Sequence, residues 1–123
     1  MKARKGYSIF SWNELLPIDK EQILKRQNSK EWFPKELTPF QQESSIEWSN
    51  SLGLRFYDEV VGWLITHRVA EDVIQYTSLF VAQEHRTLAT GILLIIESVR
   101  RHQETDVSRA IFQVRSYNRD MLK

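Results

Sequence analysis

One stretch of the chain restricts the fold more than any other, because a strand-like segment passes through a polar bend directly into a helix. Leu79–Ala82 is apolar, Gln83–Arg86 is polar, and small residues then lead into the apolar run Ile92–Ile96. The first N–H groups of a helix have no partner within the helix, and that end carries partial positive charge. The segment therefore predicts a turn that can bind a phosphate group.

The residues of this bend follow the spacing R-x-x-A-x-G, with Arg86, Ala89 and Gly91 at its defined positions. The pattern resembles the pyrophosphate-binding signature of the GNAT superfamily of acetyl-CoA-dependent N-acetyltransferases, usually written R/Q-x-x-G-x-G/A. Ala89 replaces the customary first glycine, whereas Gly91 conforms. The resemblance implies that acetyl-CoA binds at six consecutive residues, namely Arg86, Thr87, Leu88, Ala89, Thr90 and Gly91. Taken alone, these residues are also compatible with an ordinary strand-to-helix turn.

Two further segments resemble the same family in the expected order. Val60–His67 contains a Val-Gly pair after a polar hairpin tip, as in the third strand of the family. Ile111–Asn118 resembles the fifth strand, L-x-V-x-x-x-N, in which Asn118 would lie beside the pantetheine arm. In the family a main-chain N–H on the fourth strand commonly polarises the thioester carbonyl, which makes Leu79, Phe80 and Val81 the candidates here.

The resemblance also implies that the end of the domain is missing. The family continues with a helix that carries A-x-x-x-Y-x-x-x-G-F and with two more strands, whereas these 123 residues end shortly after Asn118. We therefore expect a C-terminally truncated domain that transfers acetyl groups poorly by itself. Because an uncovered sheet edge promotes pairing, we also expect a homodimer through the last strand, Ile111–Arg115.

No catalytic side chain is assigned by these patterns. Several family members use a glutamate on the fourth strand as the base, but Val73–Ser78 contains no carboxylate. Glu59, or a water held by Thr77 or Ser78, is a possible base. The family's usual acid is a tyrosine on the missing helix, and Tyr117 is the nearest alternative.

Composition restricts the class of protein. A chain of 123 residues with 41% hydrophobic and 27% charged residues is expected to form a single domain, residues 1–123. A net charge of +1 gives no argument for nucleic-acid binding, and the absence of cysteine excludes disulfides and thiolate nucleophiles. The three histidines, His67, His85 and His102, lack the spacing of metal ligands. Without an apolar run of membrane-spanning length, we expect a cytoplasmic protein.

The hydrophobic periodicity alternates between strand and helix along the chain. The elements it predicts are strands at 7–12, 53–57, 60–68, 73–81 and 109–115, and helices at 18–27, within 31–40 and at 89–103. This order predicts an α/β (α+β) domain with a mixed, mostly antiparallel sheet and helices on both faces. Trp63 is expected in the core, and one of Trp12, Trp32 and Trp48 is expected to line an acceptor cleft.

These motifs and the family resemblance are compatible with two classes of function. The first is transfer of an acetyl group from acetyl-CoA to a primary amine, or the acetyl-CoA-binding part of such an enzyme. The second is a degenerate GNAT module that binds CoA or pairs with another chain without turnover. The presence of the phosphate-binding bend favours the first class, and the missing acid-bearing helix favours the second.

Overall fold

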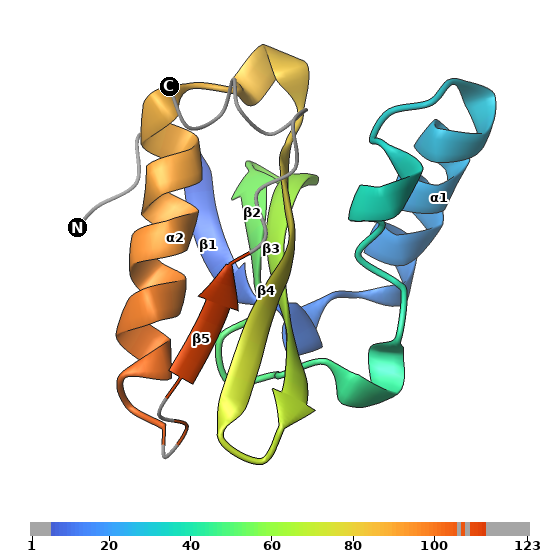
Figure 1. Cartoon of the computed structure of the whole chain (residues 1–123). Helices are drawn as coiled ribbons and strands as arrows, with labels where there is room; N and C mark the ends of the chain where they lie inside the picture. Colours follow the sequence, from blue (N-terminus) through green and yellow to red (C-terminus); the bar gives the residue numbers. More distant parts are fainter. Residues whose placement is uncertain (1–5, 106, 108, 113–123) are drawn as a thin grey trace.

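The sheet of this protein has five strands in the order β1-β2-β3-β4-β5 (Figure 1). A computed structural model describes residues 6–105, 107 and 109–112. The first four strands run antiparallel to their neighbours, and β5 runs parallel to β4. The strands are β1 (Tyr7–Ser11), β2 (Leu52–Phe56), β3 (Glu59–Ala70), β4 (Val73–Val81) and β5 (Arg109–Phe112).

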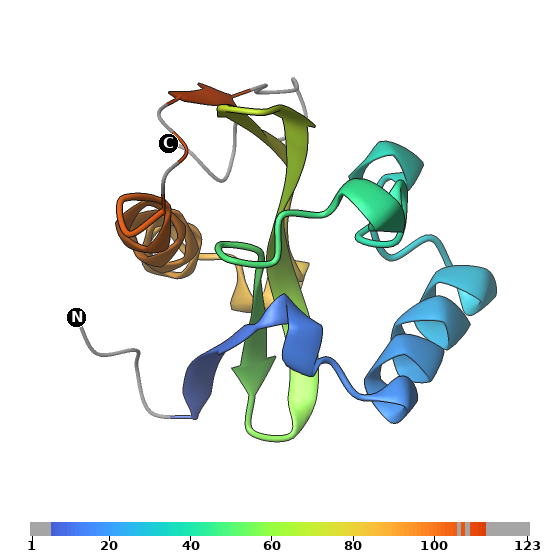
Figure 2. The same cartoon turned by 90° about the horizontal axis from the view of Figure 1, so that it is seen from below.

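Helices cover both faces of this sheet (Figure 2). One face carries α2 (Leu88–His102) and the other carries α1 (Pro17–Ser29) with two short 3-10 turns. The 3-10 turns of the chain are η1 (Trp12–Glu14), η2 (Lys35–Leu37), η3 (Glu43–Ser45) and η4 (Gln83–His85). The predicted fold class is confirmed, and so is the antiparallel meander followed by a parallel crossover.

The element boundaries differ from the predicted ones in a few places. Trp12 begins a 3-10 turn instead of ending the first strand, and the third strand is longer than predicted because its hairpin partner extends it to Ala70. The predicted last strand is described as far as Phe112, and 113–115 lie outside the described residues. The α2 helix, whose sequence is apolar almost all round, buries one side only, since Ile92 and Ile96 are exposed.

An aromatic cluster fills the core on the α1 face. Trp63 of β3 is inaccessible to solvent, as predicted, and its ring lies 4.9 Å from that of Phe80 and 5.2 Å from that of Phe33. Trp12 is also buried and packs against Trp63, with ring centres 6.1 Å apart. The packing of these rings against one another holds the loop after α1 against β3 and β4, on the face opposite α2.

Polar contacts attach α1 to the sheet, because little of its surface is apolar. Asp19, which is 4% exposed, accepts hydrogen bonds from the two Nη atoms of Arg55 at 3.0 and 2.7 Å. The same carboxylate accepts from the backbone N–H of Leu16 at 2.9 Å, so it caps the helix from its third position. The Arg55 guanidinium also stacks over the ring of Phe10, 4.4 Å from its centre.

Candidate acetyl-CoA site

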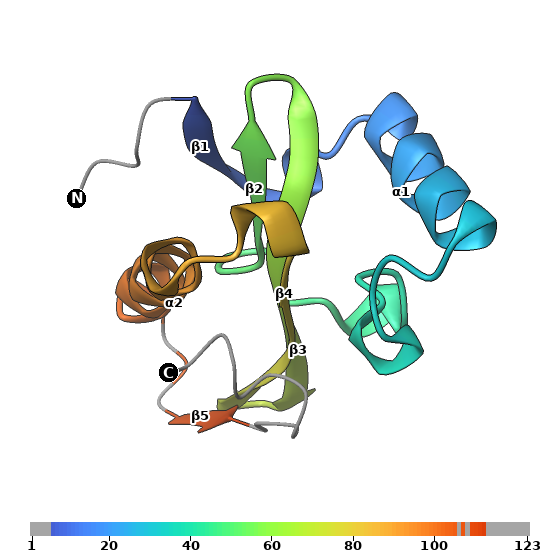
Figure 3. The ribbon, with the colours of Figure 1, turned by 90° about the horizontal axis from the view of Figure 1, so that it is seen from above.

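The bend between β4 and α2 has the predicted strand-to-helix geometry (Figure 3). After Val81 the chain makes the single turn η4 and enters α2 with Thr87 as the N-cap residue. Arg86 folds back over this bend, and its Nε and Nη2 donate to the carbonyl of Val81 at 3.1 and 3.0 Å. The Arg86 side chain therefore ties the end of β4 to the start of α2.

Two threonines order the first turn of α2. The N–H of Thr90 donates to Thr87 Oγ1 at 3.2 Å, and the N–H of Thr87 donates to Thr90 Oγ1 at 3.1 Å. Leu88 and Ala89 occupy the first two helical positions, where N–H groups have no acceptor within the helix. Gly91 follows in the same turn, and its N–H lies 3.4 Å from the carbonyl oxygen of Thr87. The structure therefore brings the six predicted residues together at one helix N-terminus.

The half of β4 that leads to this bend has an open edge in the described part of the chain. Strand β5 pairs with β4 from Val73 to Tyr76. Among residues 6–112 as far as they are described, no strand pairs with that side of Thr77–Val81. Backbone groups along this edge can therefore hydrogen-bond to a ligand.

The backbone N–H groups of Leu79, Phe80 and Val81, the three candidates for polarising a carbonyl, point in different directions. Ala82 donates its N–H to Val61 of β3 at 2.7 Å. Because N–H groups alternate sides along a strand, the N–H of Phe80 also points toward β3. The N–H groups of Leu79 and Val81 point toward the open edge. Two of the three predicted residues thus present a donor where an extended ligand arm could lie.

A β-bulge interrupts β4 next to this open edge. Ile65 pairs with Ser78, whereas Thr66 pairs with Tyr76, so Thr77 is an extra residue without a partner position on β3. The Ser78 hydroxyl donates to the carbonyl of Leu37 at 2.5 Å and accepts from the indole N–H of Trp63 at 3.0 Å. Ser78 therefore serves the packing of the η2 turn, and Thr77 is the hydroxyl that the bulge adds to the site.

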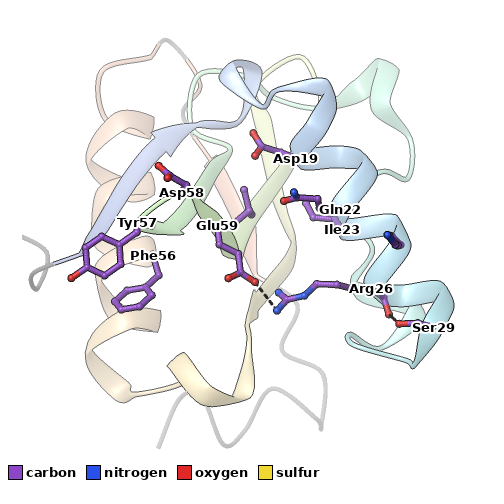
Figure 4. Close-up of a pocket in the computed structure, with 11 residues that line it drawn as sticks. Asp19, Gln22, Ile23, Arg26, Ser29, Phe56, Tyr57, Asp58 and Glu59 are labelled. Atoms are coloured by element: carbon purple, nitrogen blue, oxygen red, sulfur yellow. Dashed lines mark hydrogen bonds and ion pairs between the residues drawn. The ribbon is translucent and has the colours of Figure 1, made fainter.

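Glu59 lies in a different part of the molecule from this bulge. It starts β3 at the hairpin tip and pairs with Arg26 of α1 at 2.6 Å, across a groove of about 780 Å³ (Figure 4). Six positions of β3 separate Glu59 from Ile65, which is about 20 Å along a strand. Glu59 is therefore at the end of the sheet where α2 begins, far from the bulge. Tyr117 and Asn118 lie outside the described residues.

Each of the three histidines contacts a protein group. His67 lies in β3 with 2% of its surface exposed, and its Nδ1 is 2.6 Å from Thr77 Oγ1. His85 Nδ1 is 2.7 Å from the hydroxyl of Tyr7, and His102 Nε2 is 2.9 Å from the carbonyl of Val107. The contact between His67 and Thr77 could not be predicted from the sequence, because the bulge that aligns them is a property of the paired strands.

The remaining tryptophans separate by exposure. Trp12 is a core residue, whereas Trp48 is 44% exposed. Trp32 is half-buried beneath the guanidinium of Arg26, which lies 4.4 Å from its ring centre. Trp32 also lines a groove of about 360 Å³ together with Arg86 and the η4 turn. Of the three candidates, Trp32 is therefore the one beside the bend between β4 and α2. No helix in the described residues has the length and apolar character needed to span a membrane.

Comparison with known proteins identifies the fold. No family model matches the sequence, and no curated protein matches it either. Solved structures do match. Naa50 of Arabidopsis thaliana, in complex with the bisubstrate analogue CoA-Ac-MVNAL, aligns with a TM-score of 0.62 at 14% identity, covering 94% of this chain and 76% of that chain. An acetyltransferase from Streptococcus agalactiae aligns with a TM-score of 0.68 at 16% identity, covering 94% and 77%.

A third example is the ribosomal-protein-S18-alanine N-acetyltransferase of Escherichia coli, which aligns with a TM-score of 0.62 at 15% identity and covers 91% of this chain and 69% of that chain. At these identities the likeness is one of fold. Together with the five-stranded sheet and the crossover through α2, these alignments show that this chain has the GNAT N-acetyltransferase fold.

Proposed function

We propose that this protein binds acetyl-CoA and transfers its acetyl group to a primary amine. The observation that carries the proposal is the meeting of two features at one end of the sheet, the N-terminus of α2 and the open edge of β4. The first suits a diphosphate and the second suits an extended pantetheine arm. Acetyl-CoA contains both groups in that order, and the Naa50 structure that shares this fold holds a CoA-containing analogue.

The residues of the proposed site have distinct roles. The main chain from Arg86 to Gly91 binds the diphosphate, and the N–H groups of Leu79 and Val81 face the pantetheine and the thioester. As negative charge develops on the carbonyl oxygen, a fixed N–H donor stabilises it. The amine nitrogen bonds to the carbonyl carbon, the carbon–sulfur bond breaks, and CoA leaves as the thiolate. Asn118 is proposed beside the pantetheine on the resemblance alone.

Calorimetric titration with CoA, followed by a free-thiol assay with acetyl-CoA and a panel of primary amines, tests this proposal. We expect CoA to bind and at least one amine to release thiol faster than buffer does. Desulfo-CoA in the titration is the control that separates the diphosphate from the thiol. A chain that binds neither compound would contradict the proposal.

A second function, CoA binding without transfer, is favoured by one specific observation. The β4 strand carries no carboxylate, and its Ser78 hydroxyl is already bonded to Leu37 and Trp63. A module of this kind would bind CoA in the titration and release no thiol with any amine. The same two measurements therefore distinguish the two functions. A cytoplasmic location and a homodimer remain predictions for either function.

A further inference from the structure

We propose that Thr77 and His67 form a proton relay that removes the proton from the attacking amine, an inference that rests on the transfer function proposed above. Thr77 would touch the amine, and His67 would accept the proton behind it. The argument starts from the bulge, which adds Thr77 to β4 at the first position beyond the pairing with β5. Two residues further along is Leu79, whose N–H points to the open edge.

The relay has one accessible end and one buried end. Thr77 is half-buried, whereas His67 is 2% exposed. Thr77 Oγ1 lies 2.6 Å from His67 Nδ1, and His67 Nε2 lies 3.1 Å from the carbonyl oxygen of Gln41. Gln41 belongs to the segment between η2 and η3, on the face opposite α2 (Figure 2). The only route from the imidazole toward the open edge that these contacts describe runs through Thr77.

The hydrogen bonds of His67 determine which nitrogen of its neutral ring can accept a proton. The carbonyl of Gln41 can only accept, so His67 Nε2 must carry a hydrogen. In the neutral ring Nδ1 is then an acceptor, and the Thr77 hydroxyl donates to it. When the ring is protonated, Nδ1 donates to Thr77 Oγ1, and the hydroxyl hydrogen turns to the carbonyl of Ile65, 3.1 Å away. The same atoms therefore satisfy both protonation states without moving.

The proposed step balances in atoms and charge. The amine nitrogen forms its bond to the thioester carbon as the carbon–sulfur bond breaks and CoA leaves as the thiolate. The amine proton passes to Thr77 Oγ1, and the hydroxyl hydrogen of Thr77 passes to His67 Nδ1. The imidazolium returns this proton to solvent by the reverse route after the product leaves. Thr77 is a catalytic residue in this scheme, and His67 acts through it as a positioning residue and proton acceptor.

The charged groups on the segments packed against His67 are already paired. Glu47, which follows the bridge between Ile46 and His67, lies 2.8 Å from Arg68 of β3. Glu43 of η3 lies 3.4 Å from Lys20 of α1. The hydrogen-bond partners of the His67 ring in the described residues are the Thr77 hydroxyl and the backbone carbonyl of Gln41, which are both neutral, so neither is a carboxylate that shares the proton.

The test compares Thr77→Val, Thr77→Ser and His67→Asn with the wild-type chain. Valine keeps the shape of threonine without its hydroxyl, serine keeps the hydroxyl, and asparagine can accept a hydrogen bond without being a base. We expect Thr77→Val and His67→Asn to lower kcat about 100-fold or more, the usual loss for a proton-transfer group. Thr77→Ser should restore most of the rate, and the CoA affinity of all three variants should equal that of the wild type.

Two further measurements separate a relay from a structural role. The wild-type pH–rate profile should rise through one ionisation that disappears in His67→Asn, and imidazole ¹⁵N spectra should show the Nε2–H tautomer in the neutral ring. Thr105→Val is the matched control, because Thr105 donates to the carbonyl of His102 at 2.7 Å at the far end of α2. Thr105→Val should change neither the pH–rate profile nor the imidazole ¹⁵N spectrum.

The outcomes distinguish the relay from the transfer function itself. Wild-type turnover that persists in Thr77→Val, or the Nδ1–H tautomer in the spectra, would overturn the relay and leave the transfer function standing. A wild-type chain that binds CoA and releases no thiol with any amine would overturn both. Loss of rate in Thr77→Val with full rescue in Thr77→Ser, at constant melting temperature, would support the relay.

Discussion

The two faces of the sheet are built by different means. On one face α2 begins at a cap made by residues three positions apart, Thr87 and Thr90, and packs with a largely apolar side. On the other face α1 is mostly polar and is held by contacts between distant parts of the chain. Asp19 and Arg55, for example, are 36 residues apart.

This difference separates the two halves of the candidate site. The phosphate-binding bend belongs to the α2 face and consists of consecutive residues, so a pattern in the sequence is enough to locate it. The His67–Thr77 pair belongs to the α1 face and depends on a bulge between paired strands. Local signals therefore predict where CoA would bind, whereas non-local contacts determine that Thr77 meets His67.

The largest expected effect concerns the bend. Gly91→Trp places a bulky side chain in the first turn of α2 and should weaken CoA binding roughly 100-fold or more, about 2.7 kcal/mol. Gly91→Ala is the control, because a methyl group suits a helix and the family signature tolerates alanine. Calorimetry measures the affinity and circular dichroism checks the fold. Equal CoA affinity in a folded Gly91→Trp variant would show that the bend is an ordinary turn.

The next effect concerns the polar attachment of α1. Asp19→Asn removes the carboxylate that is hydrogen-bonded to the Arg55 guanidinium and should destabilise the protein by about 2 kcal/mol, less than for a fully buried pair. Glu43→Gln, which breaks an exposed pair with Lys20, should cost under about 0.5 kcal/mol. Urea denaturation gives both values. Similar losses in the two variants would mean that α1 does not depend on Asp19.

Hydrogen bonds from Arg55 also lower the pKa of Asp19 below its ordinary value, 3.8. A carboxylate with a lowered folded-state pKa stabilises the fold above its unfolded-state pKa. The contribution of Asp19 is therefore complete near neutral pH and is lost as the pH falls below about 4. The difference in stability between wild type and Asp19→Asn should shrink over this range.

A smaller effect should come from the cap of α2. Thr90→Ala removes the hydroxyl that accepts the N–H of Thr87 and lies 3.0 Å from the carbonyl of His85. The expected loss is about 1 kcal/mol of unfolding free energy, the usual value for a helix cap. Thr90→Ser keeps the hydroxyl and should retain most of the stability. Equal melting temperatures for Thr90→Ala and wild type would contradict a local origin for this helix terminus.

Glu97 provides a pH-dependent test on the α2 helix. The guanidinium of Arg100, with that of Arg101, lowers the pKa of this carboxylate from 4.5 to about 2. Because the folded-state pKa is the lower one, the stabilisation is present above pH 4.5 and is lost as the pH falls toward 2. Solvent screening limits it to about 0.5–1 kcal/mol. The advantage of wild type over Glu97→Gln should vanish across that interval in acid denaturation.

The smallest expected effect concerns β5, the strand at the edge of the described sheet. Ile111 of β5 is 47% exposed and lies on the strand that we expect to pair with a second copy of the chain. Ile111→Lys should abolish any concentration-dependent dimer without changing the stability of the monomer, because the side chain is already in contact with solvent. Light scattering over a range of concentrations measures the mass. A wild-type chain that stays monomeric at high concentration would exclude pairing through β5.

Much of the fold could be predicted because its signals are local. Alternating β-branched and aromatic residues indicate β3 and β4, and the polar tips near 57–59 and 70–72 indicate the hairpins at the two ends of β3. The apolar run Ile92–Ile96 after a small-residue bend indicates the crossover helix. The exposure of Ile92 and Ile96 was not predicted; these two residues lie one turn apart on the side of α2 that the sheet does not cover.

The sequence by itself determined the order of strands and helices, the fold class and the position of the bend between β4 and α2, because each depends on residues within a few positions of one another. Only the tertiary structure decided that Leu79 and Val81, and not Phe80, direct N–H groups to the open edge. It also decided that Thr77 meets His67. Both results depend on which residues pair across β3 and β4, and the bulge at Thr77 shifts that pairing by one residue.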